Sequence, residues 1–276
     1  MSSEKAPQIG RVAHASWLLF GGVFTGLTLA ACAVGAWVAL DGTGPIAEQT
    51  EYQEYSEYAA RIEVTIESGD LRVIGGADQV SVERHYEYAE QRPVFTETWA
   101  DGTLSINARC ALSGLPMVRG DHCAIGYLLR VPSAVAIEVD IGKGSIRVEE
   151  IDGELRLATG VGDVEVHHAR GPVWARSSAG SITGTGLQGP EADARTQFGD
   201  VSLGFDRPPG LAWAAADVGN VEVAVSRGDD KIASYRVRAE TADGHTYVDV
   251  VSDPASLYQI IATTDHGDVF VRYATS

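Results

Sequence analysis

A short phrase of alternating apolar and polar residues, opened by glycine, returns along the chain at a nearly constant interval. In the copy Gly162-Asp163-Val164-Glu165-Val166, two valines flank a glutamate. Because side chains alternate faces along a strand, this pattern predicts a strand whose valines face inward. The opening glycines of five successive copies lie 18, 18, 19 and 20 residues apart. These glycines are Gly144, Gly162, Gly180, Gly199 and Gly219, with a first copy at Gly69 and a last at Gly267.

The length of the interval indicates the class of repeat. Two strands of about five residues and two turns of about four fill about 18 residues, whereas helical repeats need roughly 33 to 47. A weaker second strand precedes each phrase, as in Leu155-Arg156-Leu157. We therefore predict an all-β fold, a β-solenoid or β-roll of two-stranded coils, each about 18–20 residues long. The glycines suit turns with positive φ, and the Asp, Asn or Ser after each glycine suits a bond to the turn backbone.

The N-terminal part of the chain has a different pattern. No charged residue occurs from Ala15 to Leu40, and tryptophans lie near both ends of this run. About 20 apolar residues span a bilayer as a helix, so we predict one transmembrane helix over residues 15–40. Lys5 and Arg11 precede the helix and acidic residues come after it. Positive charge stays on the cytoplasmic side, so residues 1–14 are expected inside the cell and the rest outside.

Two further interpretations concern this segment and the residues after it. The run Leu29-Ala30-Ala31-Cys32 matches a lipoprotein cleavage box in which Cys32 would be lipidated, but Ala33 to Leu40 stays apolar and favours a retained helix. Residues 41–60 contain a Gly-Thr-Gly-Pro break and interleaved glutamates and tyrosines, which predict an acidic juxtamembrane stalk. Residues 61–276 are then expected to form the extracellular domain.

The charge and the cysteines of the chain limit the range of possible functions. The net charge of −17 argues against binding to a nucleic-acid backbone, which needs clustered Lys and Arg. Outside the membrane, Cys110 and Cys123 are expected to form a disulfide, and the closed loop would contribute on the order of 3 kcal/mol. The alternative is a Cys123 nucleophile assisted by His122. Neighbouring strand residues point to opposite faces, which disfavours that arrangement.

A column of polar residues comes directly after the repeat glycines, and acids in such a column suggest calcium. The acids alternate with neutral residues, so at about 4.8 Å per coil successive carboxylates would lie roughly 10 Å apart. Calcium oxygens lie at about 2.5 Å, so we expect these residues to form turns rather than a metal site. The column consists of Ser145, Asp163, Ser181, Asp200 and Asn220.

Two adjacent pairs of residues could also carry chemistry. The side chains of His167 and His168 diverge if the two residues lie on a strand, so they cannot easily bind one metal ion. Glu149 and Glu150 lie at an expected turn, whereas glycoside cleavage needs two carboxyl groups facing each other across about 5 to 9.5 Å. We therefore expect no catalytic residue, no metal and no cofactor.

Outward aromatic residues are candidates for binding. Trp174 lies at an outward position of a predicted strand, and Phe270 and Tyr273 lie in the last coil. Together they would offer a contact to a carbohydrate or a protein, although single exposed aromatic residues are common. Residues 234–251 interrupt the period, and we expect them to cap the stack or to form a side hairpin that covers its last edge.

These features together resemble the bacterial DUF4097 family, often labelled putative adhesin, and in particular its membrane-anchored versions. The similarity covers the chain from about Ala15 to Tyr273. It rests on the apolar helix, the cysteines before Tyr127 to Pro132, the serial glycine-acid-valine phrases and the ending Gly267-Asp268-Val269-Phe270-Val271-Arg272-Tyr273. The resemblance implies a β-solenoid ectodomain with a surface or envelope role and no catalytic residues.

We therefore expect a single-pass cell-membrane protein whose non-enzymatic ectodomain is an adhesin or a structural module. Its partner would be an envelope protein or a cell-wall polymer. One alternative is an envelope-stress sensor, which would act through a membrane partner because a cytoplasmic piece of about 14 residues is too short to fold. The other is a carbohydrate-active enzyme, which would require a groove with two or three convergent carboxylates.

Overall fold

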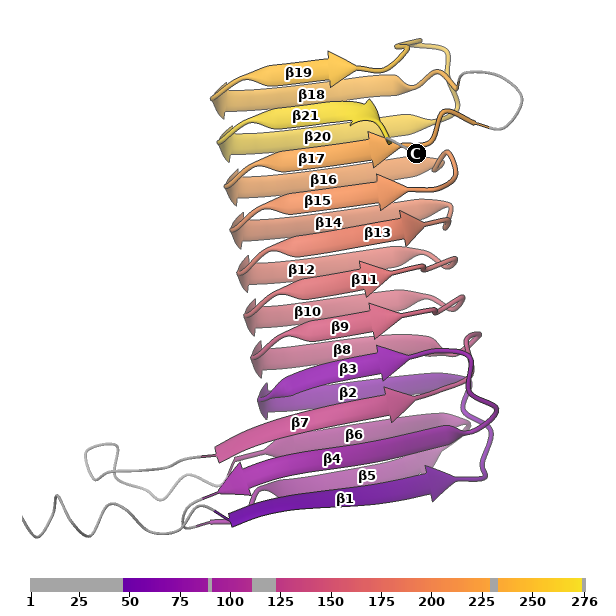
Figure 1. Ribbon diagram of the computed structural model, residues 1–276, viewed down its shortest axis with the longest axis vertical. Coiled ribbons are helices and arrows are strands. Elements are labelled where there is room, and N and C mark those ends of the chain that lie inside the picture. Colours follow the sequence, from indigo (N-terminus) through magenta and orange to yellow (C-terminus); the bar gives the residue numbers. More distant parts are fainter. Residues whose placement is uncertain (1–46, 89–90, 111–122, 229–232, 275–276) are drawn as a thin grey trace, which may run out of the picture. The chain divides into compact units, whose positions relative to one another are not determined.

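A computed structural model describes residues 47–88, 91–110, 123–228 and 233–274 (Figure 1). These residues form 21 strands, and no helix occurs among them. Accordingly, the described ranges contain no helix of the length and apolarity that crossing a membrane requires. The predicted cytoplasmic segment, the transmembrane helix and Cys32 lie outside the described residues.

The strands form two sheets. Sheet A has the order β1 (Ala47–Tyr55), β4 (Val80–Tyr88), β7 (Cys123–Arg130), β3 (Asp70–Ile74), β9 (Ile146–Glu149), β11 (Val164–His167), β13 (Ile182–Leu187), β15 (Val201–Phe205), β17 (Val221–Val225), β21 (Val269–Tyr273) and β19 (Thr246–Asp249). Sheet B has the order β18 (Arg236–Asp243), β20 (Gln259–His266), β16 (Leu211–Val218), β14 (Glu191–Phe198), β12 (Val173–Ala179), β10 (Leu155–Val161), β8 (Ala136–Lys143), β2 (Arg61–Ser68), β6 (Thr103–Arg109) and β5 (Val94–Ala100).

From β8 to β17, consecutive strands alternate between the two sheets. Each strand from β8 to β15 pairs in parallel with the strand two places further along the chain, so that Leu155 pairs with Val173 and Val164 pairs with Ile182. Each two-strand unit, called a rung below, therefore contributes one strand to each sheet. The expected all-β class is confirmed, with long and mainly parallel sheets.

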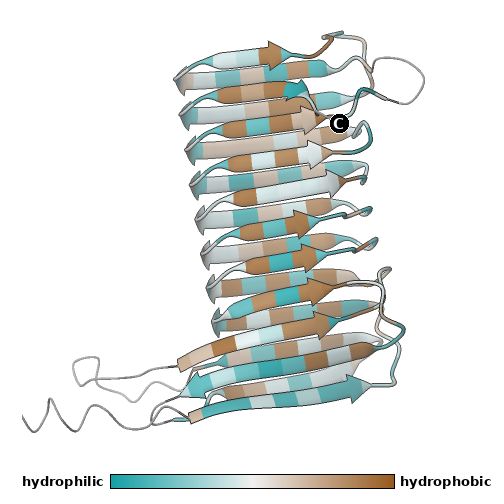
Figure 2. Ribbon diagram, in the orientation of Figure 1, coloured by the Kyte–Doolittle hydropathy of each residue, from teal (hydrophilic) through white to brown (hydrophobic). Residues whose placement is uncertain are grey.

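The inward residues of the rungs share one core. Val164, Val201 and Val221 from the glycine-led phrases are at most 1 % exposed and belong to a single cluster of buried side chains. On sheet B, the inward positions of the later rungs are smaller, as at Ala194 and Ala214. Apolar and polar bands alternate along the strands in Figure 2. Because one rung alone cannot bury its apolar side chains, stacking on neighbours supplies the hydrophobic stabilisation.

One corner of each repeat is a glycine in a conformation that other residues rarely adopt. The φ angles of the six repeat glycines lie between +135° and +153°. A Cβ atom on any of them would lie less than 3.0 Å from the carbonyl oxygen of a glycine in the neighbouring rung. Glycine is thus needed both for its backbone conformation and for the close approach of successive rungs. The six are Gly144, Gly162, Gly180, Gly199, Gly219 and Gly267.

The polar residue after each glycine links its rung to the next. Asp163 Oδ1 accepts a hydrogen bond of 2.7 Å from the backbone N–H of Ser181, and Asp200 Oδ1 accepts one of 2.7 Å from Asn220. Between them, Ser181 Oγ accepts a bond of 3.2 Å from the N–H of Asp200. The sequence predicts bonds within each turn. These bonds instead run between rungs, because the parallel register brings equivalent corners together.

Buried hydroxyl groups form a second ladder at the same corner. Four hydroxyl side chains, each 4–5 % exposed, donate hydrogen bonds of 2.8–3.0 Å to the carbonyl oxygen of a repeat glycine one rung away. These bonds satisfy both the buried hydroxyl donor and the carbonyl acceptor, and they connect the glycine corners to the core. In β16 the equivalent residue is Ala216, which has no hydroxyl. The four residues are Thr159, Ser177, Thr196 and Thr264.

The first strand corrects the expected stalk over residues 41–60. Ala47–Tyr55 forms β1, which pairs antiparallel with β4 at the edge of sheet A. Glu51 lies 3.1 Å from Arg84, and Tyr55 donates a hydrogen bond to Glu97, so charged and aromatic side chains hold the strand in place. The acidic composition of this segment therefore reflects an edge strand, in which charge discourages pairing with other chains.

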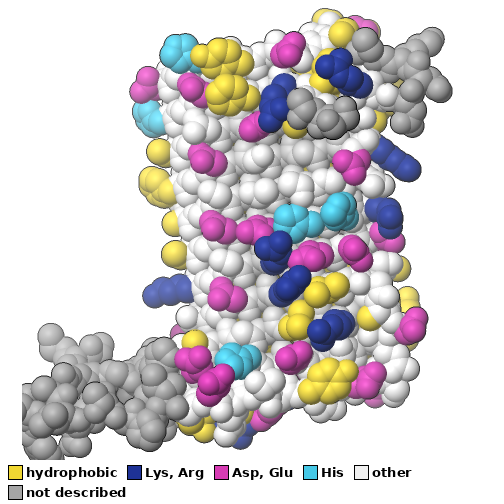
Figure 3. Space-filling model, viewed as in Figure 1, with side chains coloured by type: hydrophobic (Ala, Val, Ile, Leu, Met, Phe, Trp, Pro, Cys, Tyr) yellow, Lys and Arg dark blue, Asp and Glu magenta, His cyan; other side chains and the backbone are white. Residues whose placement is uncertain are grey.

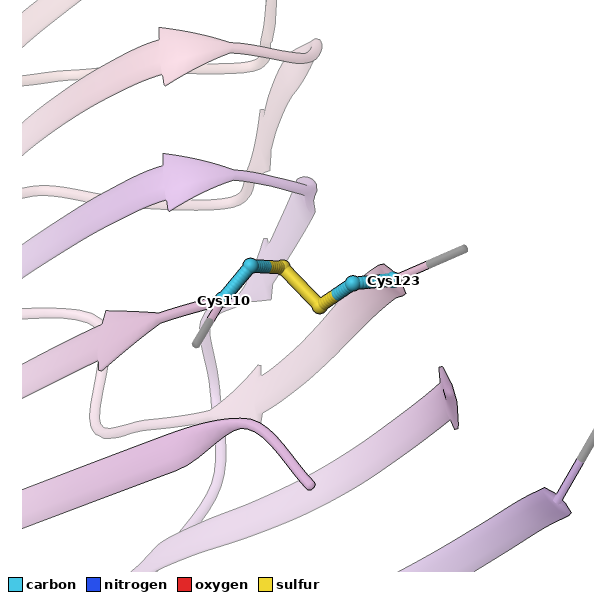
Figure 4. Close-up of a disulfide and its surroundings, with 2 residues drawn as sticks. All are labelled: Cys110 and Cys123. Carbon is cyan, nitrogen blue, oxygen red and sulfur yellow. A yellow bond between two sulfur atoms is a disulfide. The ribbon is translucent and has the colours of Figure 1, made fainter. Parts of the chain in front are cut away.

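A disulfide joins the two sheets near the same end (Figure 4). Cys110 comes after β6 in sheet B and Cys123 begins β7 in sheet A, with their Cα atoms 6.0 Å apart. In the chain-entropy model, closing a loop of this length stabilises the fold by about 3 kcal/mol. The sulfur of Cys123 is bonded and is therefore not a free nucleophile, and His122 lies outside the described residues.

Each end of the stack contains a rung that departs from chain order. Rung β2–β3 lies between rungs β6–β7 and β8–β9. The last rung in the chain, β20–β21, lies between β16–β17 and β18–β19. Within residues 234–251, β18 and β19 therefore do not form a side hairpin. Each pairs in parallel with the β20–β21 rung, and together they form the outermost rung of the stack.

Replacing Gly162 by alanine should lower the free energy of unfolding by about 2 kcal/mol or more, since the new Cβ would meet the Gly144 carbonyl at a positive φ. Gly204→Ala is the matched control in sheet A, because its Cβ would find ordinary contacts at 3.6 Å and 3.9 Å. Urea denaturation of both variants measures the difference. Equal stability of the two variants would contradict the corner constraint.

Replacing Thr196 by valine keeps the shape of the side chain and removes the bond to the Gly180 carbonyl. We expect the free energy of unfolding to fall by about 1–3 kcal/mol, because a buried carbonyl loses its partner. Thr183→Val, on the outer face of β13, is expected to change stability by about 0.5 kcal/mol or less. Thermal denaturation followed by circular dichroism compares the two. A loss no larger than that of the control would show that the hydroxyl ladder does not stabilise the stack.

Candidate ligand-binding face

The outer face of sheet B brings together five side chains from three neighbouring strands, called the Trp–Arg face below. In the parallel register, Trp174 of β12 pairs with Asp193 of β14, which in turn pairs with Trp213 of β16. Two residues further along, Arg176 pairs with Arg195. Because residues i and i+2 of a strand point to the same side, all five lie on one face.

Asp193 holds both arginines of the Trp–Arg face. Its Oδ2 atom accepts a hydrogen bond of 2.8 Å from Arg176 and one of 2.9 Å from Arg195, and its Oδ1 atom accepts one of 2.8 Å from Arg195 Nε. Arg176 also donates to the carbonyl oxygens of Ala175 and Asp193, each at 2.9 Å. The side chain of Asp193 is only 16 % exposed. Two guanidinium groups thus share one carboxylate, which leaves one positive charge on the group.

Each arginine also lies over a tryptophan ring. The guanidinium carbon of Arg176 is 4.1 Å from the ring centroid of Trp174, and that of Arg195 is 3.7 Å from the centroid of Trp213. Such cation–π contacts contribute about 0.5–1 kcal/mol each at exposed sites. Together with the shared carboxylate, they fix the planar groups in one arrangement, so a ligand would meet a preorganised surface.

Two shallow hollows flank this group. One of about 470 Å³ lies beside Arg176 and Arg195, where the small residues Ala158 and Gly160 leave space on the sheet. The other, of about 160 Å³, lies between Trp174, Arg156 and Glu191. The face can therefore seat a ring against tryptophan while guanidinium N–H groups donate to carboxylate, phosphate or hydroxyl oxygens.

The outer face of sheet A, seen in Figure 3, has a different character. Arg72 and Arg147 there lie 3.0 Å and 2.8 Å from Glu149, and Arg147 also lies 2.8 Å from Glu165. Burial opposes charge on Glu149, but the two arginines outweigh it and lower the pKa of the carboxyl. Glu150 occupies the following turn with φ of 59°. The two adjacent acids thus do not form a facing pair.

The adjacent histidines have separate environments. His167 Nδ1 lies 2.7 Å from Thr185 Oγ1, and its Nε2 lies 3.4 Å from Glu165. His168 is in the next turn, at φ of 56°. Among the described residues, no group of three or more His, Cys, Asp or Glu side chains is arranged to hold a metal ion. The polar side chains that follow the repeat glycines instead form the inter-rung hydrogen bonds described above.

The structure does not bring the three predicted aromatic residues together. Trp174 is 38 % exposed on sheet B, as its strand pattern indicates. Phe270 lies on sheet A, where its ring stacks on Tyr247 at 5.1 Å between centroids. Tyr273 donates a hydrogen bond of 2.6 Å to the carbonyl oxygen of Ala233 and is partly buried against the core. Of the three, only Trp174 belongs to the Trp–Arg face.

Four residues of the Trp–Arg face are absent from the sequence-based candidates, although the sequence contains a signal for them. The weaker strands read Val173-Trp174-Ala175-Arg176, then Ala192-Asp193-Ala194-Arg195 and Ala212-Trp213-Ala214-Ala215. Aligning these strands at the repeat interval places tryptophan, aspartate and tryptophan in one column and the two arginines in the next. The glycine-led strands have the more regular pattern, and they form the other sheet.

Comparison with known proteins gives only structural similarity. No protein-family model and no curated protein matches the chain. A putative cell adhesion protein from Clostridium sporogenes is 10 % identical with a TM-score of 0.39, and the match covers 83 % of this chain and all of that one. A putative adhesin from Bacteroides fragilis is 13 % identical with a TM-score of 0.41, covering 83 % and 97 %. A putative lipid binding protein from Parabacteroides distasonis is 13 % identical with a TM-score of 0.30, covering 83 % and 98 %. Membership of the DUF4097 family stays a prediction.

Replacing Asp193 by alanine should lower the free energy of unfolding by about 1–3 kcal/mol, because two partly buried guanidinium groups lose their shared carboxylate. Glu240→Ala, which removes an exposed carboxylate from the Arg238 pair, should lower the free energy of unfolding much less, because water and salt screen exposed ion pairs. Urea denaturation of both variants provides the measurement. Similar losses in both would show that Asp193 does not organise the face.

Proposed function

We propose that the described strands form a β-solenoid and that the chain is a single-pass membrane protein with this solenoid outside the cell. The uncharged run from Ala15 to Leu40, with basic residues before it and acidic residues after it, supports the anchor and its orientation. The Cys110–Cys123 disulfide supports an oxidising compartment, since disulfides are rare in the cytosol.

We propose that the ectodomain binds and does not catalyse, and that its ligand is a saccharide-rich polymer of the cell wall. The Trp–Arg face is the observation that carries this proposal. Trp174 and Trp213 offer flat apolar rings for sugar rings, and Arg176 and Arg195 offer donors for hydroxyl or acidic groups. The parallel strands repeat every 4.8 Å or so, so a long polymer can meet several rungs at once.

The test is co-sedimentation of the purified full-length chain in detergent with insoluble cell-wall fractions. The double variant Trp174→Ala/Trp213→Ala should bind about tenfold or more weakly, because tryptophans at the centre of an interface contribute about 2 kcal/mol or more. The control variant Tyr247→Ala/Phe270→Ala removes the stacked aromatic pair of sheet A and should bind like the unaltered chain. Equal binding by both double variants, or no binding by the unaltered chain, would refute the proposal.

A further inference from the structure

The two ends of the stack are built differently. At the end formed by β1 and β5, Arg84 lies 3.1 Å from Glu51 and 3.0 Å from Glu97, and Phe95 and Trp99 pack against the core. Paired charges and aromatic rings thus close the interior at that end. They also make the edge a poor template for another strand, because an inward charge would be buried on pairing.

The opposite end is open. β18 and β19 are the outermost strands of sheets B and A, so within the described residues the outer backbone groups of both lack a strand partner. Val248 is 44 % exposed, whereas Val271, its partner one rung inward, is 1 % exposed. Val237 is likewise only partly buried, while its partner Ile260 is fully buried.

Within the described residues, this open edge lacks two of the usual protections against strand pairing. Neither β18 nor β19 contains a proline or a charged residue at an inward position. The inward residues are Val237, Ala239 and Thr241 on β18, with Thr246 and Val248 on β19. An edge with no proline and no inward charge can accept an added strand.

We propose that this end binds a second copy of the same chain, with β18 antiparallel to β18 and β19 antiparallel to β19 of the other copy. The two-fold axis would pass through Ala239 and run perpendicular to the sheets, as in a closed dimer. In that register Arg238 of each copy faces Glu240 of the other, so both cross-strand pairs have opposite charges. Val237 of each copy faces Thr241 of the other, so residues that point into the core of one copy pair with residues that point into the core of the other.

The second sheet fits the same axis. Ala239 lies five residues before the corner glycine Gly244, and Val248 lies four residues after it, so both are near the middle of the rung. Antiparallel pairing of β19 about Val248 buries the valine of each copy against the other and places Tyr247 opposite Asp249. The dimer thus closes the core at the end where the described residues of a single copy leave it open. The inference is independent of any ligand on the Trp–Arg face.

Cysteine crosslinking of the full-length chain in detergent tests the register. In a Cys32→Ser background, Ala239→Cys places the new cysteines of two copies opposite each other, within disulfide distance for an antiparallel pair. Mild oxidation should give a reducible dimer as the main species. Thr98→Cys, on the edge strand β5 at the other end of sheet B, is the control and should stay monomeric. Equal crosslinking of both variants, or of neither, would overturn the proposal.

A charge exchange tests the partner contacts. Adding Arg238→Glu to the Ala239→Cys chain places glutamates opposite each other and should lower the dimer yield at least fivefold. Adding Glu240→Arg as well restores opposite charges and should recover the yield. Circular dichroism and melting temperature confirm that each variant is folded, because this exposed pair contributes little to the monomer. An unchanged yield in the single variant, or no recovery in the double variant, would refute the proposed register.

Discussion

The close approach of successive glycine corners governs how every other part of the stack is placed. Each repeat glycine sits against the carbonyl oxygen of the glycine in the rung before it, with no room for a side chain between them. The corner therefore admits only one spacing and one register. Asp163, Ser181 and Asp200 reinforce that register through side-chain bonds to the neighbouring backbone. Once the corners are aligned, every strand residue has a fixed neighbour in the next rung.

That register creates the core and the outer faces at the same time. The alignment that stacks Val164 on Ile182 inside sheet A also places Trp174 beside Asp193 outside sheet B. A one-residue slip would expose the valines and bury the arginines, so the hydrophobic core protects the arrangement of the Trp–Arg face. Function on this scaffold can therefore change through outward residues alone, while inward residues and corner glycines keep the stack.

The central repeats were predictable because their pattern is local. The interval between Gly144 and Gly219 and the paired valines were enough to predict an all-β fold and the inward residues. The order of rungs at the two ends could not be predicted from the sequence. The strands β20–β21 have the same local pattern whether they lie outside or inside β18–β19 in space. The strand over Ala47–Tyr55 was missed since its stabilising partners, Arg84 and Glu97, lie in other strands. Likewise, Arg176 and Arg195 can be recognised as neighbours only when their strands are aligned side by side.

The internal position of β20–β21 has a consequence for how the chain is made. During synthesis β18–β19 leaves the ribosome before β20–β21, on which it will rest, so it cannot dock until those later strands emerge. Docking at this end therefore does not follow the order of synthesis, and it depends on long-range contacts that form slowly. The rungs in the middle of the stack do not depend on later strands in this way. Gain or loss of a whole repeat between β8 and β17 would therefore leave both ends of the stack unchanged. Variation in length among related chains should accordingly accumulate in the centre.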